Sequence, residues 1–174
     1  MSEVQIRPTI PADLDALAEI LVEVHAHDGY PVEGVDFPRD WVELSDAIGQ
    51  WTALLDGEPV GHVALMPPSA GDAAPALLLQ RQEAASARIA VLARLFVDPR
   101  ARRRKAAKRL LDVVENKALE DGLIPVLDVM KKDRAAIRLY ESRGWEVLGT
   151  IDHPVPESAS EPGYAFALRS KPIR

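Results

Sequence analysis

The chain has 174 residues, of which 47% are hydrophobic and 28% are charged, a composition typical of a globular protein and unlike that of a disordered chain. It contains no cysteine, which excludes disulfides, thiolate metal sites and a cysteine nucleophile, and which suits a reducing cytosol. The formal net charge is −6, so the molecule as a whole should repel nucleic acid and anionic membranes.

No stretch of the sequence has the hydropathy of a signal peptide or a membrane span. The opening residues, Met-Ser-Glu-Val-Gln-Ile-Arg, lack an apolar core, and no later run approaches membrane-spanning length. There is no internal repeat, and no linker divides the chain. We therefore expect a single domain over residues 1–174, located in the cytoplasm and without a membrane partner.

The first third of the chain predicts a strand followed by helices. Residues 4–7 alternate as in a short strand, and Pro11 suits the first turn of a helix that we expect over about 11–25. The side chains expected on the buried face of this helix, at helical spacing, are Leu14, Leu17, Ala18, Leu21 and Val22. His-Asp-Gly-Tyr-Pro at 27–31 should end it, and a short helix is expected around 40–48.

The middle of the chain predicts a hairpin and a long loop. Residues 51–55 and 59–65 flank the turn Asp56-Gly57, which is a strong hairpin signal. Residues 67–87 are rich in Pro, Ala and Ser, which predicts a loop with at most one helical turn near 77–82. A connection of this length inside a compact domain is more often functional than not.

The second half alternates strands and helices. Residues 89–97 predict a central strand that Asp98-Pro99 ends, and a helix is expected over about 104–121. The apolar residues that should form the buried stripe of this helix are Ala107, Leu110, Leu111, Val114 and Ala118. A strand over 124–129 and a helix over 134–143 come next.

Two last strands are expected over 145–151 and 164–168, with a Pro- and Ser-rich loop between them. His153 would belong to that loop, and His62, on a hairpin strand, is more simply structural. This order of elements predicts an α/β domain with a mixed sheet.

One segment departs from the acidic average. Its basic residues are Arg100, Arg102, Arg103, Arg104, Lys105, Lys108 and Arg109. The segment lies where a strand passes into a helix, and the first N–H groups of a helix lack internal partners and bind phosphate. We interpret it as a local anion site, against the simpler alternative of a solvated turn.

The same segment carries a family resemblance. Leu95-Phe-Val-Asp-Pro-Arg-Ala-Arg-Arg-Arg-Lys-Ala-Ala-Lys-Arg-Leu-Leu111 resembles the acetyl-CoA motif of GNAT acetyltransferases, which reads Arg or Gln, two residues, Gly, one residue, then Gly or Ala. Arg102 fills the first position and Ala107 the last. Lys105 stands at the middle glycine, and Arg103 at the glycine that often follows the first Arg. Glycine there lets the backbone approach a pyrophosphate closely.

A second resemblance follows at the expected distance. Asp133-Arg-Ala-Ala-Ile-Arg-Leu-Tyr-Glu-Ser-Arg-Gly-Trp145 resembles the family signature Asn-x-x-Ala-x-x-x-Tyr followed by Gly-Phe. Ala136, Tyr140 and Gly144 match, Trp145 stands for the aromatic, and Asp133 replaces Asn. Aspartate keeps the acceptor of asparagine but loses its amide donor.

The resemblance implies a GNAT-type three-layer fold, with flanking helices and a mixed central sheet whose parallel strands splay apart to hold CoA. It implies acetyl-CoA as cosubstrate and no metal, with Tyr140 protonating the departing thiolate. Pantetheine would lie along Leu95, Phe96 and Val97, one of whose backbone N–H groups would stabilise the oxyanion. The residues expected at the pyrophosphate are Arg102, Arg103, Arg104, Lys105, Ala106, Ala107 and Lys108. Asp133 would lie near the pantetheine arm.

The implied reaction is direct attack of an amine on the thioester. An alkyl ammonium has a pKa of about 10.4, so a base or a desolvating pocket is needed. Glu23, His25 and Asp28 are candidate bases, with a water relay as an equal alternative. His25, Asp28 and Tyr30 are also the candidate acceptor-binding residues, although a histidine in the last turn of a helix often only caps it.

Several questions stay open from the sequence. The acceptor is a small amine or a peptide amine, and the acidic charge weakly favours a small cation. The scattered histidines give no metal-ligand spacing. One alternative function is a GNAT-like protein that binds CoA or another ligand without catalysis. Another, less favoured, is a nucleic-acid-binding module that uses residues 100–109. The oligomeric state, a homodimer included, is also open.

Overall fold

The structure is a computed structural model. The residues that it describes are 2–81, 88–155 and 158–169, without the side chains of 158 and 159. They form two compact units. The first unit consists of Met1–Met66 and Leu92–Asn116, and the second of Pro67–Val91 and Lys117–Arg174. Each unit is described by itself, and the single domain expected over 1–174 stays a prediction.

The first unit opens with antiparallel strands. Strand β1 (Gln5–Pro8) pairs with β2 (Gly49–Leu55), and β2 pairs with β3 (Glu58–Met66). The backbone at Asp56 and Gly57 has positive φ, 52° and 81°, as the two central residues of a tight hairpin turn require. The predicted first strand and hairpin are confirmed.

The first helix of this unit is longer than the sequence predicted, and the second is shorter. A 3-10 turn, η1 (Pro11–Asp13), leads into α1 (Leu14–Asp28), and α2 covers Pro38–Val42. Helix α1 runs three residues past the predicted end, and Gly29, at φ 72°, caps it. Helix α2 stops well before the predicted end at 48.

The buried face of α1 also differs in part. The residues of α1 that are buried are Leu14, Leu17, Ala18, Ile20, Leu21 and Val24. Val22, which was expected among them, is 40% exposed. The apolar run 20–22 contains more hydrophobic residues than one helix face can bury, and spacing alone does not decide which of them faces the core.

The strand–turn–helix segment matches the prediction closely. Strand β4 covers Ile89–Val97, a 3-10 turn η3 covers Pro99–Ala101, and α4 covers Ala106–Glu120. Both β4 and α4 have residues in each unit. Leu110, Leu111, Val114 and Ala118 are all fully buried, which confirms the predicted stripe of α4. Ala107, the first residue of that stripe, is half-buried.

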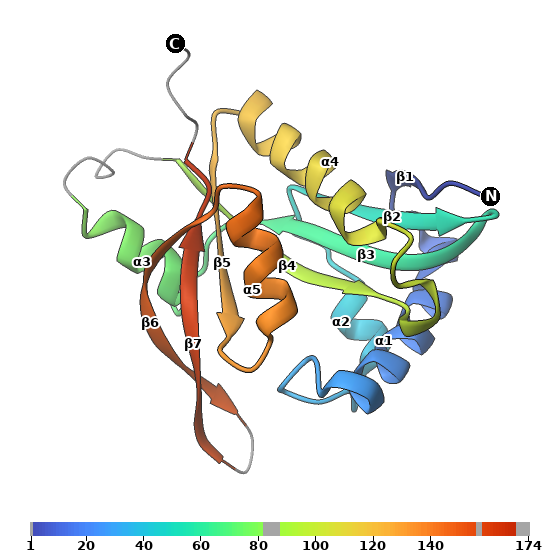
Figure 1. The fold of residues 1–174 in the computed structure, drawn as a ribbon, viewed down its shortest axis with the longest axis horizontal. Coiled ribbons are helices and arrows are strands. Elements are labelled where there is room, and N and C mark those ends of the chain that lie inside the picture. Colours follow the sequence, from blue (N-terminus) through green and yellow to red (C-terminus); the bar gives the residue numbers. More distant parts are fainter. Residues whose placement is uncertain (1, 82–87, 156–157, 170–174) are drawn as a thin grey trace. The chain divides into compact units, whose positions relative to one another are not determined.

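Neighbouring residues of β3 show how helices cover the first unit. A Cβ added to Gly61 would lie 3.4 Å from Leu110 of α4. The ring of His62 instead stacks on Phe96, which belongs to the apolar cluster of α1. Successive side chains of a strand point to opposite faces, so α1 and α4 lie on opposite faces of β3. This part of the sheet is a middle layer (Figure 1).

The second unit contains α3 (Ala73–Leu79), β5 (Ile124–Met130), α5 (Arg134–Ser142), β6 (Glu146–Val155) and β7 (Ser158–Ala167). Its sheet has the parallel pair β4–β5 and the antiparallel pairs β5–β7 and β6–β7. The predicted strand over 124–129 and helix over 134–143 are confirmed to within one residue.

Two expectations in this unit are wrong. Helix α3 begins four residues before the predicted turn, and the part of the predicted loop over 82–87 lies outside the described residues. Strands β6 and β7 reach far beyond their predicted bounds, so His153 is a strand residue paired with Glu161 and not a loop residue. Of the Pro and Ser residues that predicted a loop, Pro156 lies outside the described residues, and the others lie on an outer strand pair, where an unpaired N–H is tolerated.

Helices cover both faces of this sheet as well. Phe166 of β7 packs against Tyr140 of α5. Its neighbour Ala165 is paired with Gly149 of β6, where an added Cβ would meet Leu77 of α3. The alternation of side chains along β7 therefore places α3 and α5 on opposite faces.

The strand order of the whole sheet is β1-β2-β3-β4-β5-β7-β6, which confirms the predicted α/β class with a mixed sheet (Figure 1). The parallel ladder between β4 and β5 contains three residue pairs and ends at Val91–Val126. Among the described residues, no helix has the length and apolar character to span a bilayer.

Candidate functional site

The strand expected to hold pantetheine has an irregular backbone just before the expected residues. Arg94 has φ 57°, a conformation that non-glycine residues of a strand rarely adopt. Leu95, Phe96 and Val97 follow it. Phe96 is buried, whereas Leu95 and Val97 are half-buried. The strand ends where the backbone N–H of Asp98 donates to the carbonyl of Val60, at 2.7 Å.

Asp98 fixes the turn that leaves β4. Its carboxylate accepts hydrogen bonds from the backbone N–H of Arg100 at 2.9 Å and from the Arg100 guanidinium at 2.9 Å. Burial opposes ionisation of this carboxyl, but the hydrogen bonds from Arg100 outweigh burial and lower its pKa. The charge of Arg100 is thereby paired within its own turn, although its side chain is 83% exposed.

The backbone of this turn has positive φ at two positions. Arg103 has φ 67° and Lys105 has φ 65°. These are the two positions at which the acetyl-CoA motif has glycine. The chain thus adopts the left-handed conformation that glycine would provide, with two residues for which that conformation is strained. Both side chains are exposed.

Helix α4 begins directly after this turn. The N–H of Arg109 donates to the carbonyl of Lys105 at 3.0 Å, so the N–H groups of Ala106, Ala107 and Lys108 precede the first bond of the helix. Such groups, at the positive end of a 15-residue helix, favour an anion. Ala106 is buried, whereas Ala107 is half-buried and Lys108 is exposed.

The basic side chains around this helix end divide into two groups. Arg100 pairs with Asp98, Arg102 with Asp28, and Arg109 with the carbonyl of Val4. The basic residues that take part in no ion pair among the described residues are Arg103, Arg104, Lys105 and Lys108. These four remain available for a phosphate.

Arg102 reaches from the turn to the end of α1. Its guanidinium binds Asp28 through two nitrogens, one of them 3.3 Å from Oδ1. The hydrogen bond from Arg102 lowers the pKa of Asp28 against the effect of burial, and His27 adds a contact at 2.8 Å. Two residues that the sequence assigned to different ligands, one to CoA and one to the acceptor, are therefore partners of each other.

The other candidate acceptor residues support the segment after α1. His25 Nδ1 lies 3.0 Å from the carbonyl of Pro31, and the His25 carbonyl accepts from the N–H of Gly29. Tyr30 packs edge-on against Trp41, with ring centroids 5.6 Å apart. The structure thus gives His25 and Tyr30 packing and capping roles, and the acceptor role stays a prediction.

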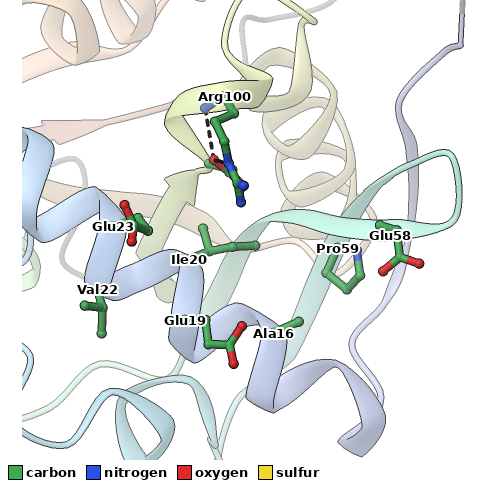
Figure 2. A pocket seen from close by; sticks show the side chains of 9 residues that line it. Ala16, Glu19, Ile20, Val22, Glu23, Glu58, Pro59 and Arg100 are labelled. Carbon is green, nitrogen blue, oxygen red and sulfur yellow. Dashed lines mark hydrogen bonds and ion pairs between the residues drawn. The ribbon is translucent and has the colours of Figure 1, made fainter.

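Glu23, a candidate base, lies elsewhere on the first unit. It lines a groove of about 630 Å³ between α1, the end of the hairpin and the turn after β4. Figure 2 shows Glu19 and Glu23 on α1 and Glu58 on the hairpin around this groove, with Arg100 above it. Glu23 is therefore grouped with three other acids, Glu19, Glu58 and Asp98, rather than with Leu95, Phe96 or Val97.

In the second unit, α5 carries Tyr140 into the core. Its ring contacts Trp145, with centroids 5.7 Å apart, and Phe166, at 6.2 Å. Burial, together with the charge of Asp133, raises the pKa of Tyr140. The phenol is thus kept protonated, the state in which it can donate a proton. Asp133 lies at the start of the helix, where its carbonyl accepts from Ile137.

The structure also indicates a residue that sequence reasoning missed. Asp128 lies on β5, is accessible to solvent, and has its pKa raised, mainly by partial burial under α3 and less by the charge of Asp72. A backbone hydrogen bond to Ala74 and the charge of His153 act in the opposite direction. The sequence signal was a lone acid in the apolar run Ile124–Met130.

Asp128 and Tyr140 lie on opposite faces of the sheet of the second unit. Asp128 is paired with Ala165, and the preceding Leu127 is paired with Phe166, the residue that Tyr140 contacts. Side-chain alternation along β5 therefore separates the two groups by the thickness of the sheet. Within the described residues, no group of three or more His, Asp or Glu side chains is arranged to hold a metal ion.

A family model described as the acetyltransferase (GNAT) family matches residues 14–145. That range contains both signature segments and extends from the start of α1 to the end of the turn after α5. No curated protein matches the chain.

Solved structures of similar fold cover almost the whole chain. Arabidopsis thaliana NAA60 in complex with acetyl-CoA has a TM-score of 0.72 at 21% identity, covering 95% of this chain and 97% of that chain. The ribosomal-protein-S18-alanine N-acetyltransferase from Escherichia coli has a TM-score of 0.69 at 17% identity, covering 98% and 99%. An N-acetyltransferase from Staphylococcus aureus Mu50 has a TM-score of 0.72 at 18% identity, covering 96% and 98%. At these identities the likeness concerns the fold, and it confirms the predicted one.

Proposed function

The chain belongs to the GNAT acetyltransferase family, and from this premise we propose that it moves an acetyl group from acetyl-CoA to a primary amine by direct attack in a ternary complex. Acyl-CoA-dependent transfer is the general activity of the family. The amine acceptor and the roles of individual residues are our proposal for this chain.

One observation carries the CoA part of the proposal. The turn before α4 has positive φ at Arg103 and Lys105 and leads into the unbonded N–H groups of Ala106, Ala107 and Lys108. Backbone donors, a helix end and cations without ion pairs favour the same ligand, a pyrophosphate. The chain therefore keeps the backbone form that the glycine motif encodes, although it lacks the glycines.

Tyr140 is the proposed acid. A phenol is protonated at neutral pH even at its ordinary pKa, and burial raises the pKa of Tyr140 further, so the hydroxyl has a proton to give to a leaving thiolate. The N–H groups of Leu95, Phe96 and Val97 are the proposed contacts for pantetheine and for the developing oxyanion. Asp133 contributes to the state of Tyr140 through its charge and is proposed to lie near the pantetheine arm.

Asp128 is the proposed base, in preference to Glu23, His25 and Asp28. A carboxyl with a raised pKa is a stronger base than an ordinary one, and Asp128 is accessible to solvent. In direct transfer, one proton leaves the nucleophile while another reaches the leaving group on the far side of the carbonyl carbon. An acid and a base on opposite faces of one sheet suit this requirement.

The acceptor class stays open between small amines and peptide amines. The name of one similar structure, the ribosomal-protein-S18-alanine N-acetyltransferase, describes an alanine of a ribosomal protein as acceptor, which suits a peptide amine. The net charge of −6 suits a cationic acceptor of either kind. A cytoplasmic location and the absence of a metal stay predictions from the sequence, and the oligomeric state, a homodimer included, stays open.

Titration calorimetry with acetyl-CoA, followed by release of free thiol across a panel of amines and N-terminal peptides, tests the proposal. We expect saturable binding and thiol release with at least one acceptor class. Binding without turnover on any amine would favour the non-catalytic alternative, which the replacement of Asn by Asp133 supports. No heat at millimolar acetyl-CoA would contradict the proposal at its first step.

A further inference from the structure

A fully buried histidine lies next to the irregular part of β4. His62 of β3 has no exposed surface, and both of its ring nitrogens have polar neighbours. Nδ1 lies 2.8 Å from the carbonyl oxygen of Arg94, and Nε2 lies 3.1 Å from the side-chain amide of Gln50. The ring also stacks on Phe96, with centroids 5.4 Å apart and an angle of 27° between the planes. All of these residues belong to the first unit.

The residue that His62 contacts is the one where β4 departs from regular geometry. Arg94 has φ 57°, and its guanidinium donates to the carbonyl of Trp41 and lies 4.8 Å from the centre of the Trp41 ring. A non-glycine residue in this conformation costs about 1–3 kcal/mol unless its surroundings hold it there. Here the side chain is held by Trp41 and the main-chain carbonyl by His62.

The protonation state of His62 defines which nitrogen donates. Burial lowers its pKa to about 4, so the ring is neutral near pH 7 and has one N–H. A carbonyl oxygen only accepts, so Nδ1 carries the proton and donates to Arg94. Nε2 is then the acceptor, so the Gln50 amide, whose Oε1 is placed 3.1 Å from Nε2, must be turned over to donate through its nitrogen.

We propose that His62 is a positioning residue, which holds the backbone of β4 at Arg94 so that the N–H groups of Leu95 and Val97, on the edge of β4 away from β3, are presented to acyl-CoA. This inference rests on the proposed function. The hydrogen bond fixes the carbonyl of the peptide unit that joins Arg94 to Leu95. The orientation of that unit determines the direction of the Leu95 N–H, because the two groups share one plane.

The packing beside His62 supports a positioning role for this part of β3. The preceding residue is Gly61, where an added Cβ would lie 3.0 Å from the carbonyl of Phe96. Strand β3 therefore contacts two carbonyls of β4, one at Arg94 through a side chain and one at Phe96 through close backbone approach. An apolar residue at 62 would fill the space but would leave the Arg94 carbonyl without its buried donor.

A matched pair of variants separates this hydrogen bond from the loss of the ring. In His62→Asn, the side-chain nitrogen occupies the position of Nδ1 and can still donate to Arg94. In His62→Gln, the side-chain amide reaches the position of Nε2, where its oxygen can accept from the Gln50 amide, so the contact with Gln50 is kept and the one with Arg94 is lost. Both variants lose the stacking on Phe96 and both remain polar and uncharged.

The measurement is the Kd for CoA by calorimetry, with thermal unfolding as the check on folding. We expect the Kd to rise about tenfold in His62→Gln, which corresponds to one or two lost hydrogen bonds, and to stay within about threefold of the wild type in His62→Asn. Equal affinity of His62→Gln and the wild type would overturn the inference while leaving the proposed function intact. A wild type that does not bind CoA would overturn both.

A measurement on the unaltered chain covers the case in which the variants do not fold. The ring ¹⁵N resonances of His62 should show a neutral ring with the proton on Nδ1, and they should shift on addition of CoA. A proton on Nε2, or resonances that do not respond to saturating CoA, would contradict the inference.

Discussion

The turn before α4 (residues 102–105) and the α5 segment (residues 133–145) contrast in almost every physical respect. The turn is exposed and strongly basic, and it keeps a left-handed backbone at Arg103 and Lys105 without glycine. The α5 segment buries its key side chain, Tyr140, and keeps a glycine, Gly144, at φ 88°. One segment offers backbone donors and charge, and the other offers a single hydroxyl in an apolar setting.

This contrast shows which parts of a motif tolerate substitution. An exposed turn can adopt positive φ with Arg or Lys because the side chains extend into solvent and the cost is confined to local strain. A buried acid has no such freedom, because its burial is what sets its pKa. Changes to the buried segment should therefore affect the chemical step most, and changes to the turn should affect stability and CoA affinity by smaller amounts.

The largest expected effect comes from Tyr140→Phe. Removing the hydroxyl should lower kcat about 100-fold, the range of one general acid, while the Kd for CoA stays nearly unchanged. Tyr164→Phe, in the same unit, is the matched control, because it removes a hydroxyl from a ring that packs against Phe166 and Lys131. Steady-state kinetics with the best acceptor measure the difference, and an unchanged kcat in Tyr140→Phe would return this tyrosine to a packing role.

Asp128→Asn should lower kcat/KM about tenfold or more and remove a pH dependence. A base must be ionised, so wild-type activity should fall as the pH drops through the raised pKa of Asp128, and this limb should be absent in the variant. An acidic limb that persists in Asp128→Asn would mean that Asp128 is not the base.

Asp128→Asn should lower activity but raise the free energy of unfolding. A pKa raised by folding means that the folded state favours the protonated carboxyl, so ionisation destabilises it at pH values above the raised pKa. The amide should therefore make the fold more stable near pH 7 and make its unfolding free energy less dependent on pH. Urea unfolding at several pH values checks this, and a less stable variant at pH 7 would argue against a raised pKa.

Lys105→Gly should stabilise the fold by about 1 kcal/mol, because relief of positive-φ strain exceeds the entropic cost of glycine. Thermal unfolding should show a rise of about 2–4 °C, and the Kd for CoA should be equal or lower. Arg104→Gly, at a residue without positive φ, is the control and should destabilise. A large loss of CoA affinity in Lys105→Gly would mean that the lysine itself binds a phosphate.

The smallest expected effect comes from Asp28→Asn. Without its carboxylate partner, Arg102 is released for a phosphate, so CoA should bind about threefold more tightly at low salt. Asp15→Asn makes the same change of charge on α1 at its exposed pair with Arg39 and should leave the Kd unchanged. Weaker binding in Asp28→Asn would show that the ion pair helps to shape the site.

The sequence predicted the strand–turn–helix around Asp98 and the α5 segment well, because local signals determine them. Alternation, the Asp-Pro stop and helical spacing all act within a few residues. The final hairpin was underestimated because Pro and Ser indicate loops only on average, and pairing with a neighbouring strand overrides them. The exposed position of Val22 likewise depends on tertiary packing.

The candidate site was predictable as a set of residue types but not as a set of partners. The basic run indicated an anion site, yet nothing in it showed that Arg102 would bind Asp28 or that Arg100 would bind Asp98. The role of His62 was also hidden, because its partner Arg94 lies 32 residues away in the chain. Contacts over such separations follow from the register of the sheet, which a single sequence does not encode locally.

The ion pair between Arg102 and Asp28 connects two segments that lie 74 residues apart in the chain. If each partner also contacts a substrate, the two binding events are coupled, and thermodynamic linkage makes this coupling reciprocal. If a cofactor phosphate takes Arg102, it frees the carboxylate at the end of α1. By the same amount, a cationic amine that neutralises Asp28 must raise the affinity for the cofactor. A single side-chain contact is then enough to make the binding of the two substrates cooperative, without any movement of the backbone.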